Sequence, residues 1–336
     1  MHPGTKLVPT SRTDEIAQAL WYVAPGHAEI REEKLTAPGP GDVRVRALCG
    51  ALSRGTERLV LAGHVPASEF ERMRAPFMGG NFPFPVKYGY STVGSVEAGP
   101  AGLEGQIVFA LHPHQNLFNI PSSAVVRLPD ALPPTRAVLA ANMETALNAV
   151  WDGAAGPADR IAIIGAGAVG ALVAFLCGRI VGAEVTLIDI NPARAEVARR
   201  LAVDFATPER APLNCDLVFQ ASATASGLAT ALESCGEEAT VVDLSWYGKG
   251  QIEVALGAAF HSRRLRLVSS QVSQVALSRR PRWTRNRRLA AALSLLGDDC
   301  LDAIIAPAVT FQDLPARLPD ILNVKSNTLC QLIRYA

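Results

Sequence analysis

Three glycines, Gly165, Gly167 and Gly170, have the spacing of a turn that holds a dinucleotide. They lie in IAIIGAGAVG, between an apolar run typical of a buried strand and an apolar helix that starts at Ala168 and Val169. Gly165 would make the tight turn, Gly167 would let a pyrophosphate approach the backbone, and Gly170 would let the helix pack closely on the strand. The helix N-terminus favours the phosphates. The sequence therefore predicts a dinucleotide site, the alternative being a glycine-rich turn in an unrelated doubly wound fold.

An acidic residue at the end of the next predicted strand indicates which dinucleotide is bound. Asp189 ends the stretch EVTLID, 19 residues after Gly170. A carboxylate at this distance can hydrogen-bond the ribose hydroxyls and would repel a 2′-phosphate. We therefore expect NAD rather than NADP, with Ile190 and Arg194 as further cofactor contacts. Arg194 keeps NADP open as the less favoured cofactor, because its guanidinium could contact an adenosine phosphate.

The elements that must position these groups change in character near residue 136. Before it, short alternating or apolar stretches are separated by Gly and Pro, which is typical of an antiparallel barrel or sandwich. These stretches are DVRVRAL, STVGSVEAG, GQIVFAL and SAVVRLP. After it, apolar strands alternate with helices as far as RRLRLVSSQVS, and the closing CQLIRY is predicted to pair back into the first part. The predicted fold class is α/β, with a Rossmann doubly wound parallel sheet and a β-rich domain.

The composition excludes several classes of function. Of 336 residues, 49% are hydrophobic and 19% are charged, which is enough to fill a sizeable core. A net charge of +1 gives no general attraction to nucleic acid or to an anionic membrane. Six cysteines lie far apart with no CxxC pair, which indicates neither a zinc ribbon nor a disulfide framework. With no apolar leader visible, we expect reduced thiols and a cytoplasmic location.

Several motifs resemble those of the medium-chain dehydrogenase/reductase superfamily, the alcohol dehydrogenase-like enzymes. CGALSRGTE is similar to the family's Cys-Gly-Thr/Ser-Asp segment, VKYGYSTVGSVEAG to its Gly-His-Glu segment, and LEGQIVFAL to its Gly-Asp-Arg-Val turn. The resemblance covers essentially the whole chain. It implies a GroES-like catalytic domain over residues 1–136 and 277–336, a Rossmann NAD-binding domain over residues 137–276, and a homodimer.

Other residue types stand where zinc members of this family hold their metal. Alignment on the Gly-Thr-acid core places Arg54, or with a one-residue gap Ser53, at the ligand cysteine. The same alignment places Tyr90 at the ligand histidine. Glu144 is the only remaining ligand, and one carboxylate cannot hold zinc alone. The resemblance therefore implies a zinc-independent branch, similar to the bacteriochlorophyllide hydroxyethyl dehydrogenases.

Without zinc, side-chain donors must polarise the substrate oxygen or move its proton. Tyr90 is the leading candidate for a hydroxyl donor, although it could instead pack against the nicotinamide or the core. Thr56 stands at the position of the family's relay hydroxyl. Lys87 could lower the pKa of the Tyr90 phenol or be a solvated lysine. His112, two residues before His114, could be a general acid or base near neutral pH, or one of a satisfied loop pair.

Two further groups of residues could reach the site. Glu144 and Thr145 begin the helix before the glycine motif and, by the resemblance, should lie near the nicotinamide. There Glu144 could orient a histidine or accept a proton. The stretch 279–288 contains six arginines. We expect it to be a solvated face or an oligomer contact rather than a nucleic-acid site, unless Arg282 or Arg285 reaches an acidic substrate group.

These features lead to three hypotheses about function. The leading one is a zinc-independent NAD(H)-dependent oxidoreductase that transfers a hydride on an alcohol/carbonyl pair. Its small-molecule substrate is expected to be apolar, because the long loop 64–88 is rich in phenylalanine. The second is an NADPH-dependent reductase of conjugated C=C bonds, of the quinone or enoyl type. The third is a nucleotide-binding protein without turnover. No zinc, nucleic acid or membrane is expected to bind.

Overall fold

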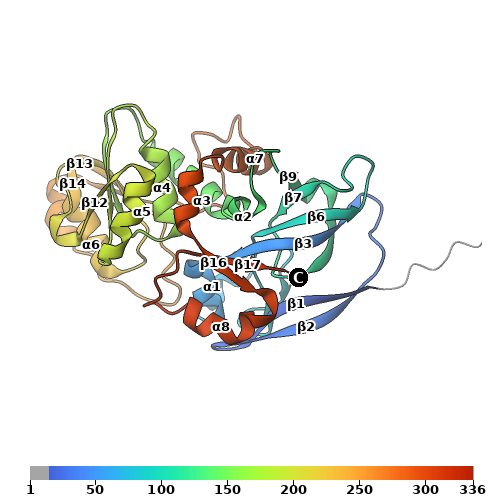
Figure 1. Ribbon diagram of the computed structural model, residues 1–336. Coiled ribbons are helices and arrows are strands. Elements are labelled where there is room, and N and C mark those ends of the chain that lie inside the picture. Colours follow the sequence, from blue (N-terminus) through green and yellow to red (C-terminus); the bar gives the residue numbers. More distant parts are fainter. Residues whose placement is uncertain (1–14, 336) are drawn as a thin grey trace, which may run out of the picture.

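The computed structural model describes residues 15–335, which form a parallel sheet with helices and a β-rich region. Figure 1 shows the parallel sheet at the left of the molecule and the strands of the N-terminal part at the right. Helix α3 (Ala140–Gly153) lies where the two regions meet. Within the described residues, no helix is both long enough and apolar enough to cross a bilayer.

Six parallel strands form the sheet that carries the glycine motif. Their order is β12-β11-β10-β13-β14-β15. Their bounds are β10 (Arg160–Ile164), β11 (Glu184–Ile188), β12 (Asp204–Ala206), β13 (Cys215–Gln220), β14 (Cys235–Asp243) and β15 (Arg266–Ser269). The order reverses between β10 and β13, where an open parallel sheet forms a crevice at the carboxyl ends of its strands. The predicted doubly wound sheet is confirmed.

The central strands β10, β11 and β13 are mostly apolar because helices cover both faces of the sheet there. In β10, Ile161 and Ile163 pack into the cluster formed with α3, α4 and α5, whereas Ala162 and Ile164 pack on the side of α6. The two sets alternate along the strand because successive side chains point to opposite faces. The covering helices are α4 (Ala168–Cys177), α5 (Ala195–Leu201) and α6 (Ala225–Ser234).

The β-rich region is built around β3 (Asp42–Leu52). A seven-stranded sheet has the order β16-β17-β3-β6-β7-β9, with β8 also paired to β3, and a smaller sheet has the order β2-β1-β5-β4. The other strands are β1 (Glu15–Ala24), β2 (His27–Leu35), β4 (Gly79–Gly80), β5 (Val86–Lys87), β6 (Thr92–Ala98), β7 (Ile107–Ala110), β8 (Leu117–Pro121), β9 (Val125–Arg127), β16 (Ile305–Thr310) and β17 (Cys330–Arg334). Apolar clusters centred on Phe118 and on Tyr22 fill this region.

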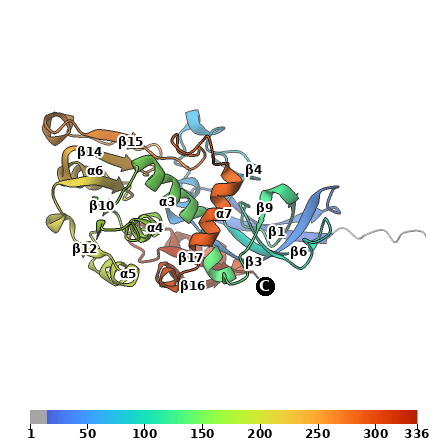
Figure 2. The ribbon, with the colours of Figure 1, turned by 90° about the horizontal axis from the view of Figure 1, so that it is seen from above.

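The tail of the chain returns to the β-rich region, as the sequence predicts. β17 lies between β16 and β3, and it pairs antiparallel with β3. Figure 2 shows α7 lying against α3. The remaining helices are α1 (Arg54–Leu61), α2 (Pro134–Ala137), α7 (Arg285–Leu295) and α8 (Leu314–Ile321).

Candidate functional site

The glycine motif forms a tight turn at the carboxyl end of β10. Gly165 has φ +101°, and a Cβ there would lie 2.7 Å from the Ser222 backbone nitrogen. A Cβ on Gly170 would lie 1.9 Å from the Gly165 carbonyl oxygen, so only glycine permits this contact. Gly167 is exposed, and a Cβ there would meet no atom within 4 Å. The turn is therefore closed on the protein side and open on the side where a phosphate would approach.

The N-terminus of α4 points its backbone donors at this opening. Gly167 is the N-cap and offers no side-chain cap. The N–H of Ala171 donates to the Gly167 carbonyl at 2.9 Å, which leaves the earlier N–H groups, those of Ala168, Val169 and Gly170, available to a phosphate. The partial positive charge of the helix end adds to this preference for an anion.

Asp189 is held in place beside the turn. One carboxylate oxygen accepts from the Ala166 N–H at 2.8 Å, and the other accepts from the Asn191 N–H at 2.8 Å. Each oxygen keeps a lone pair that a ribose hydroxyl can use. Ile190 is 84% exposed and can cover an adenine ring. Arg194 donates to the Asn327 carbonyl at 2.8 Å, so its guanidinium is anchored to the C-terminal loop. These residues fit a dinucleotide.

Tyr90 lies in a group of hydroxyl and amide side chains between the two regions. Tyr90 precedes β6, Ser53 is the N-cap of α1, and Thr56 is in its first turn. Burial and the charge of Glu57 raise the pKa of Tyr90 to about 12, and the neighbouring Ser53 and Thr56 side chains act in the opposite direction. Ser53 Oγ donates to Asn142 Oδ1 of α3 at 3.3 Å. The group can donate a hydrogen bond to a substrate oxygen and share its proton.

Glu57 joins a fully buried cluster behind this group. One of its carboxylate oxygens accepts from Tyr22 Oη at 2.7 Å and lies 2.9 Å from His114 Nε2, and the other accepts from the Ser53 N–H at 2.8 Å. Gly89 faces the His114 ring: it has φ +121°, and a Cβ there would lie 2.8 Å from His114 Cδ2. The sequence offered Glu57 only as part of an aligned motif and His114 only as half of a loop pair. No local signal pairs them.

The expected roles of Lys87 and His112 do not agree with their positions. Lys87 Nζ binds Glu33 Oε2 at 2.7 Å and Gln115 Oε1 at 2.9 Å, and the pKa of Tyr90 is raised rather than lowered. His112 is buried and stacks on Phe118 with ring centres 3.7 Å apart. Burial lowers the pKa of His112 to about 3. It therefore stays neutral and cannot titrate as an acid or base near neutral pH.

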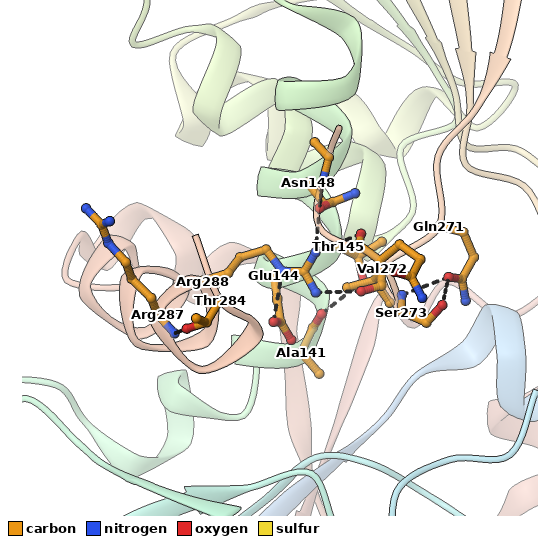
Figure 3. Close-up of polar contacts among 12 residues, drawn as sticks. Ala141, Glu144, Thr145, Asn148, Gln271, Val272, Ser273, Thr284, Arg287 and Arg288 are labelled. Carbon is orange, nitrogen blue, oxygen red and sulfur yellow. Dashed lines mark hydrogen bonds and ion pairs between the residues drawn. The ribbon is translucent and has the colours of Figure 1, made fainter. Parts of the chain in front are cut away.

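Glu144 lies on the face of α3 turned toward α7 rather than in the group around Tyr90. Its Oε1 accepts from Arg288 Nε at 2.9 Å, and both side chains are buried (Figure 3). The expectation that Glu144 orients a histidine or accepts a substrate proton is therefore replaced by an ion pair. Thr145 Oγ1 donates to the Ala141 carbonyl at 3.0 Å within α3. Of the arginine-rich stretch, Arg288 is enclosed by protein.

The phenylalanines of the loop 64–88 do not together define a substrate pocket. Phe82 is buried, and Phe70 and Phe84 pack against the same apolar cluster. Phe77 is 44% exposed and lies over His112 with ring centres 5.9 Å apart. Of these four phenylalanines, Phe77 is the exposed one, so it is the one that could contact an apolar substrate.

The zinc positions of the aligned family are taken up by other contacts. Arg54 Nε donates to the Ile321 carbonyl at 2.9 Å, and its Nη2 donates to the Asn323 carbonyl at 2.6 Å. Tyr90 and Ser53 belong to the hydroxyl group described above. Among residues 15–335, no three His, Cys, Asp or Glu side chains gather closely enough to hold a metal ion.

Solved structures share this fold although their sequences differ. A candidate zinc-binding dehydrogenase from Sinorhizobium meliloti, bound to NADP, has a TM-score of 0.76 at 16% identity, over 95% of this chain and 99% of that one. An alcohol dehydrogenase from Escherichia coli, complexed with NADH and described as short chain, has a TM-score of 0.75 at 15% identity, over 95% and 99%. A thermostable alcohol dehydrogenase from Pyrobaculum aerophilum has a TM-score of 0.76 at 17% identity, over 95% and 100%.

The comparisons with sequences give no relative. No family model matches the chain, and no curated protein matches it. The structural likenesses show the fold and confirm the predicted combination of a Rossmann domain with a GroES-like domain. The domain boundaries at residues 136 and 277 stay a prediction.

Proposed function

We propose that this protein is an NAD(H)-dependent oxidoreductase that acts on an alcohol/carbonyl pair without zinc. The observation that carries the proposal is that Asp189 and the glycine turn share the carboxyl edge of the sheet, and that the C-terminal loop joins this edge to the start of α1: Arg194 donates to the Asn327 carbonyl, and Arg54, next to Ser53, donates to the Thr328 carbonyl. Lys249, which follows β14, links the two: its N–H donates to the His64 carbonyl at 3.1 Å and its Nζ to the Gly63 carbonyl at 2.9 Å, just beyond α1.

The residues of the Tyr90 group have distinct roles in this proposal. A nicotinamide, when bound, supplies the hydride chemistry. With a pKa of about 12, Tyr90 is protonated at neutral pH and donates a hydrogen bond to the substrate oxygen. The Ser53 and Thr56 hydroxyls can each accept one hydrogen bond while donating another, so they would relay the proton that the substrate oxygen gains or loses between that oxygen and bulk water, and would not store it. Asn142 orients Ser53 from α3.

Cofactor preference separates this proposal from the reduction of C=C bonds with NADPH. Asp189 supports NADH, because its carboxylate would repel the 2′-phosphate of NADPH. The structures similar in fold include one bound to NADP and one complexed with NADH, so the fold is compatible with either. The zinc-independent chemistry is supported by Arg54, Ser53 and Tyr90, none of which suits zinc.

Titration calorimetry with NADH and NADPH tests the proposal directly. We expect NADH to bind at least tenfold more tightly than NADPH. Absence of binding of either nucleotide would refute the function, and a preference for NADPH would favour the C=C reductase. A screen of alcohols and carbonyls with bound NAD(H), with elemental analysis of the same sample, tests turnover without zinc. About one zinc per chain in an active sample would overturn the zinc-independent mechanism.

A further inference from the structure

The segment that leaves β15 is tied to its neighbours at every second residue. At each of four positions, either a backbone group or the side chain forms a hydrogen bond with α3 or with α7. These positions are Ser270, Val272, Gln274 and Ala276. Two contacts come directly from α3: Ser270 Oγ donates to Asp152 Oδ2 at 2.7 Å, and the Ala276 N–H donates to Asn148 Oδ1 at 3.0 Å. The backbone of segment 270–276 is therefore held against α3.

Arg288 of α7 supplies the two middle contacts. It is 1% exposed. Its Nη2 donates to the Val272 carbonyl at 2.5 Å and its Nη1 to the Gln274 carbonyl at 3.1 Å. The same guanidinium binds Asn148 Oδ1 and Glu144 Oε1 on α3 (Figure 3). One side chain thus joins α7, α3 and the segment, with its charge balanced by Glu144, and only the planar fork of arginine can serve all these acceptors.

The segment lies at the edge of the sheet that carries the cofactor residues. It follows the carboxyl end of β15, and the Ser270 N–H donates to the Asp243 carbonyl at the end of β14 at 2.9 Å. The ribose-binding Asp189 follows β11 and the phosphate turn follows β10, so a dinucleotide lying along this edge extends its other half toward β13, β14 and β15. That is the end beside α1, as the contact between Lys249 and His64 shows.

Two of the residues between the fixed positions point the other way. Gln271 and Ser273 are exposed, and Figure 3 shows their side chains directed away from Arg288. Gln271 Oε1 accepts from the Ser273 N–H at 2.7 Å and also from the Ser273 hydroxyl, which holds the two side chains together. The Gln274 N–H also donates to the Gln271 carbonyl at 3.3 Å, so residues 271–274 form a turn whose carbonyls at 272 and 274 are held by Arg288 while the Gln271 and Ser273 side chains are exposed.

We propose that Arg288 is a positioning residue, which holds segment 270–276 so that Gln271 and Ser273 form the wall against the nicotinamide half of the bound dinucleotide. This inference rests on the proposed function, because it requires the nucleotide to lie along the crevice. In this proposal Arg288 acts by holding the segment and does not contact the cofactor.

The test compares NADH with ADP-ribose, which carries the adenosine end and both phosphates but no nicotinamide. Calorimetry is carried out on the wild type, Arg288→Met and Arg288→Lys. We expect the Kd for NADH to rise about tenfold or more in both variants, because a shifted wall no longer fits the ring, while the Kd for ADP-ribose stays within about twofold. Arg285→Met, an exposed position on the same helix, is the matched control and should bind both ligands as the wild type does.

The outcomes separate the inference from the proposed function. Wild type that binds neither ligand refutes both. Wild type that binds both, with Arg288 variants that weaken both equally or neither, refutes the role of Arg288 alone. Should the variants not fold, hydrogen exchange on the wild type decides: NADH must protect the amides of residues 271–275 more than ADP-ribose does, and equal protection by the two ligands overturns the inference.

Discussion

The imidazole of His114 and the carboxylate of Glu57 meet 2.9 Å apart, with both side chains essentially removed from solvent. Glu57 also accepts from Tyr22 and from the Ser53 N–H, so it fixes the N-cap residue of α1. The cluster therefore sets the position of the Ser53 hydroxyl beside Tyr90. Its part in the site is to hold the hydroxyl group in place.

Removal of the Glu57 carboxylate should destabilise the protein strongly. Glu57→Ala leaves Tyr22 and His114 without a partner in a buried space, which we expect to lower the free energy of unfolding by about 3 kcal/mol or more. Glu57→Gln keeps an acceptor oxygen and should cost less, about 1–3 kcal/mol. Urea unfolding measures both. Glu196→Ala, which breaks an exposed pair with Arg199, is the control and should change little. Equal losses in all three variants would contradict the assigned role of the cluster.

Gly89→Ala should be far more damaging than the same change at Gly102. Both glycines have positive φ, +121° and +88°. At Gly102 a Cβ meets nothing within 4 Å, so only backbone strain of about 1 kcal/mol is expected. At Gly89 the new methyl also collides with the buried His114 ring, and we expect a loss of roughly 3 kcal/mol. The two unfolding free energies, measured under one set of conditions, should differ by the cost of this collision. Equal unfolding free energies in the two variants would mean that the space beside the His114 ring accommodates the methyl group.

Tyr90→Phe should slow turnover and spare cofactor binding. Loss of the hydroxyl donor is expected to reduce kcat by about a hundredfold or more, while the Kd for NADH stays within about twofold. Because the pKa of Tyr90 is raised to about 12, its protonated form persists through the alkaline range. Between pH 7 and about pH 10, ionisation of Tyr90 should therefore cause no loss of rate in the wild type. The pH profiles of the wild type and of Tyr90→Phe should have the same shape in this range. A variant with wild-type kcat would remove Tyr90 from the mechanism.

His112 should make the protein less stable in weak acid. Its pKa is about 3 when folded and 6.5 in the unfolded chain, so the unfolded chain binds the extra proton between these values. Stability is then complete above pH 6.5 and falls as the pH drops toward 3. Between pH 7 and pH 5 the loss from this one group is about 2 kcal/mol. Urea unfolding at the two pH values should show this loss in the wild type and a smaller one in His112→Gln. Equal losses would mean that another group dominates.

Asp189→Asn should weaken the preference for NADH over NADPH. The amide oxygen can still accept from a backbone N–H, but the charge that repels a 2′-phosphate is gone. We expect the ratio of the two Kd values to fall about tenfold. Asp204→Asn, an exposed acid on the neighbouring strand β12, is the matched control and should leave the ratio unchanged. An unchanged ratio in Asp189→Asn would place cofactor selection elsewhere.

The fold was predictable where one segment carries its own signal. The glycine turn, the apolar runs of β10 to β14 and the return of β17 each follow from local spacing and burial. The hairpin of β1 and β2 was not among the predicted strands. β2, with the sequence HAEIREEKL, is only partly buried and mostly charged, so it lacks the alternation that identifies a half-buried strand.

The site was less predictable, because its contacts join distant residues. Thr56 and Tyr90 came from alignment to a family pattern, and they lie in one group. The pairing of Glu57 with His114 spans 57 positions, and that of Glu144 with Arg288 spans 144. Neither pair has a fixed spacing or a motif. Among six arginines in one stretch, only tertiary packing decides that Arg288 is the enclosed one.

The position of β17 between β16 and β3 has a consequence for how the chain matures on the ribosome. The parallel sheet is continuous in sequence, so it can form as soon as β15 has emerged. The seven-stranded sheet must wait for residues 305–334, and until then the edge of β3 that β17 covers is open to other strands. We expect the nascent protein to pass through a stage with a formed parallel sheet and an unfinished β-rich region, and this exposed edge is where a chaperone would be needed.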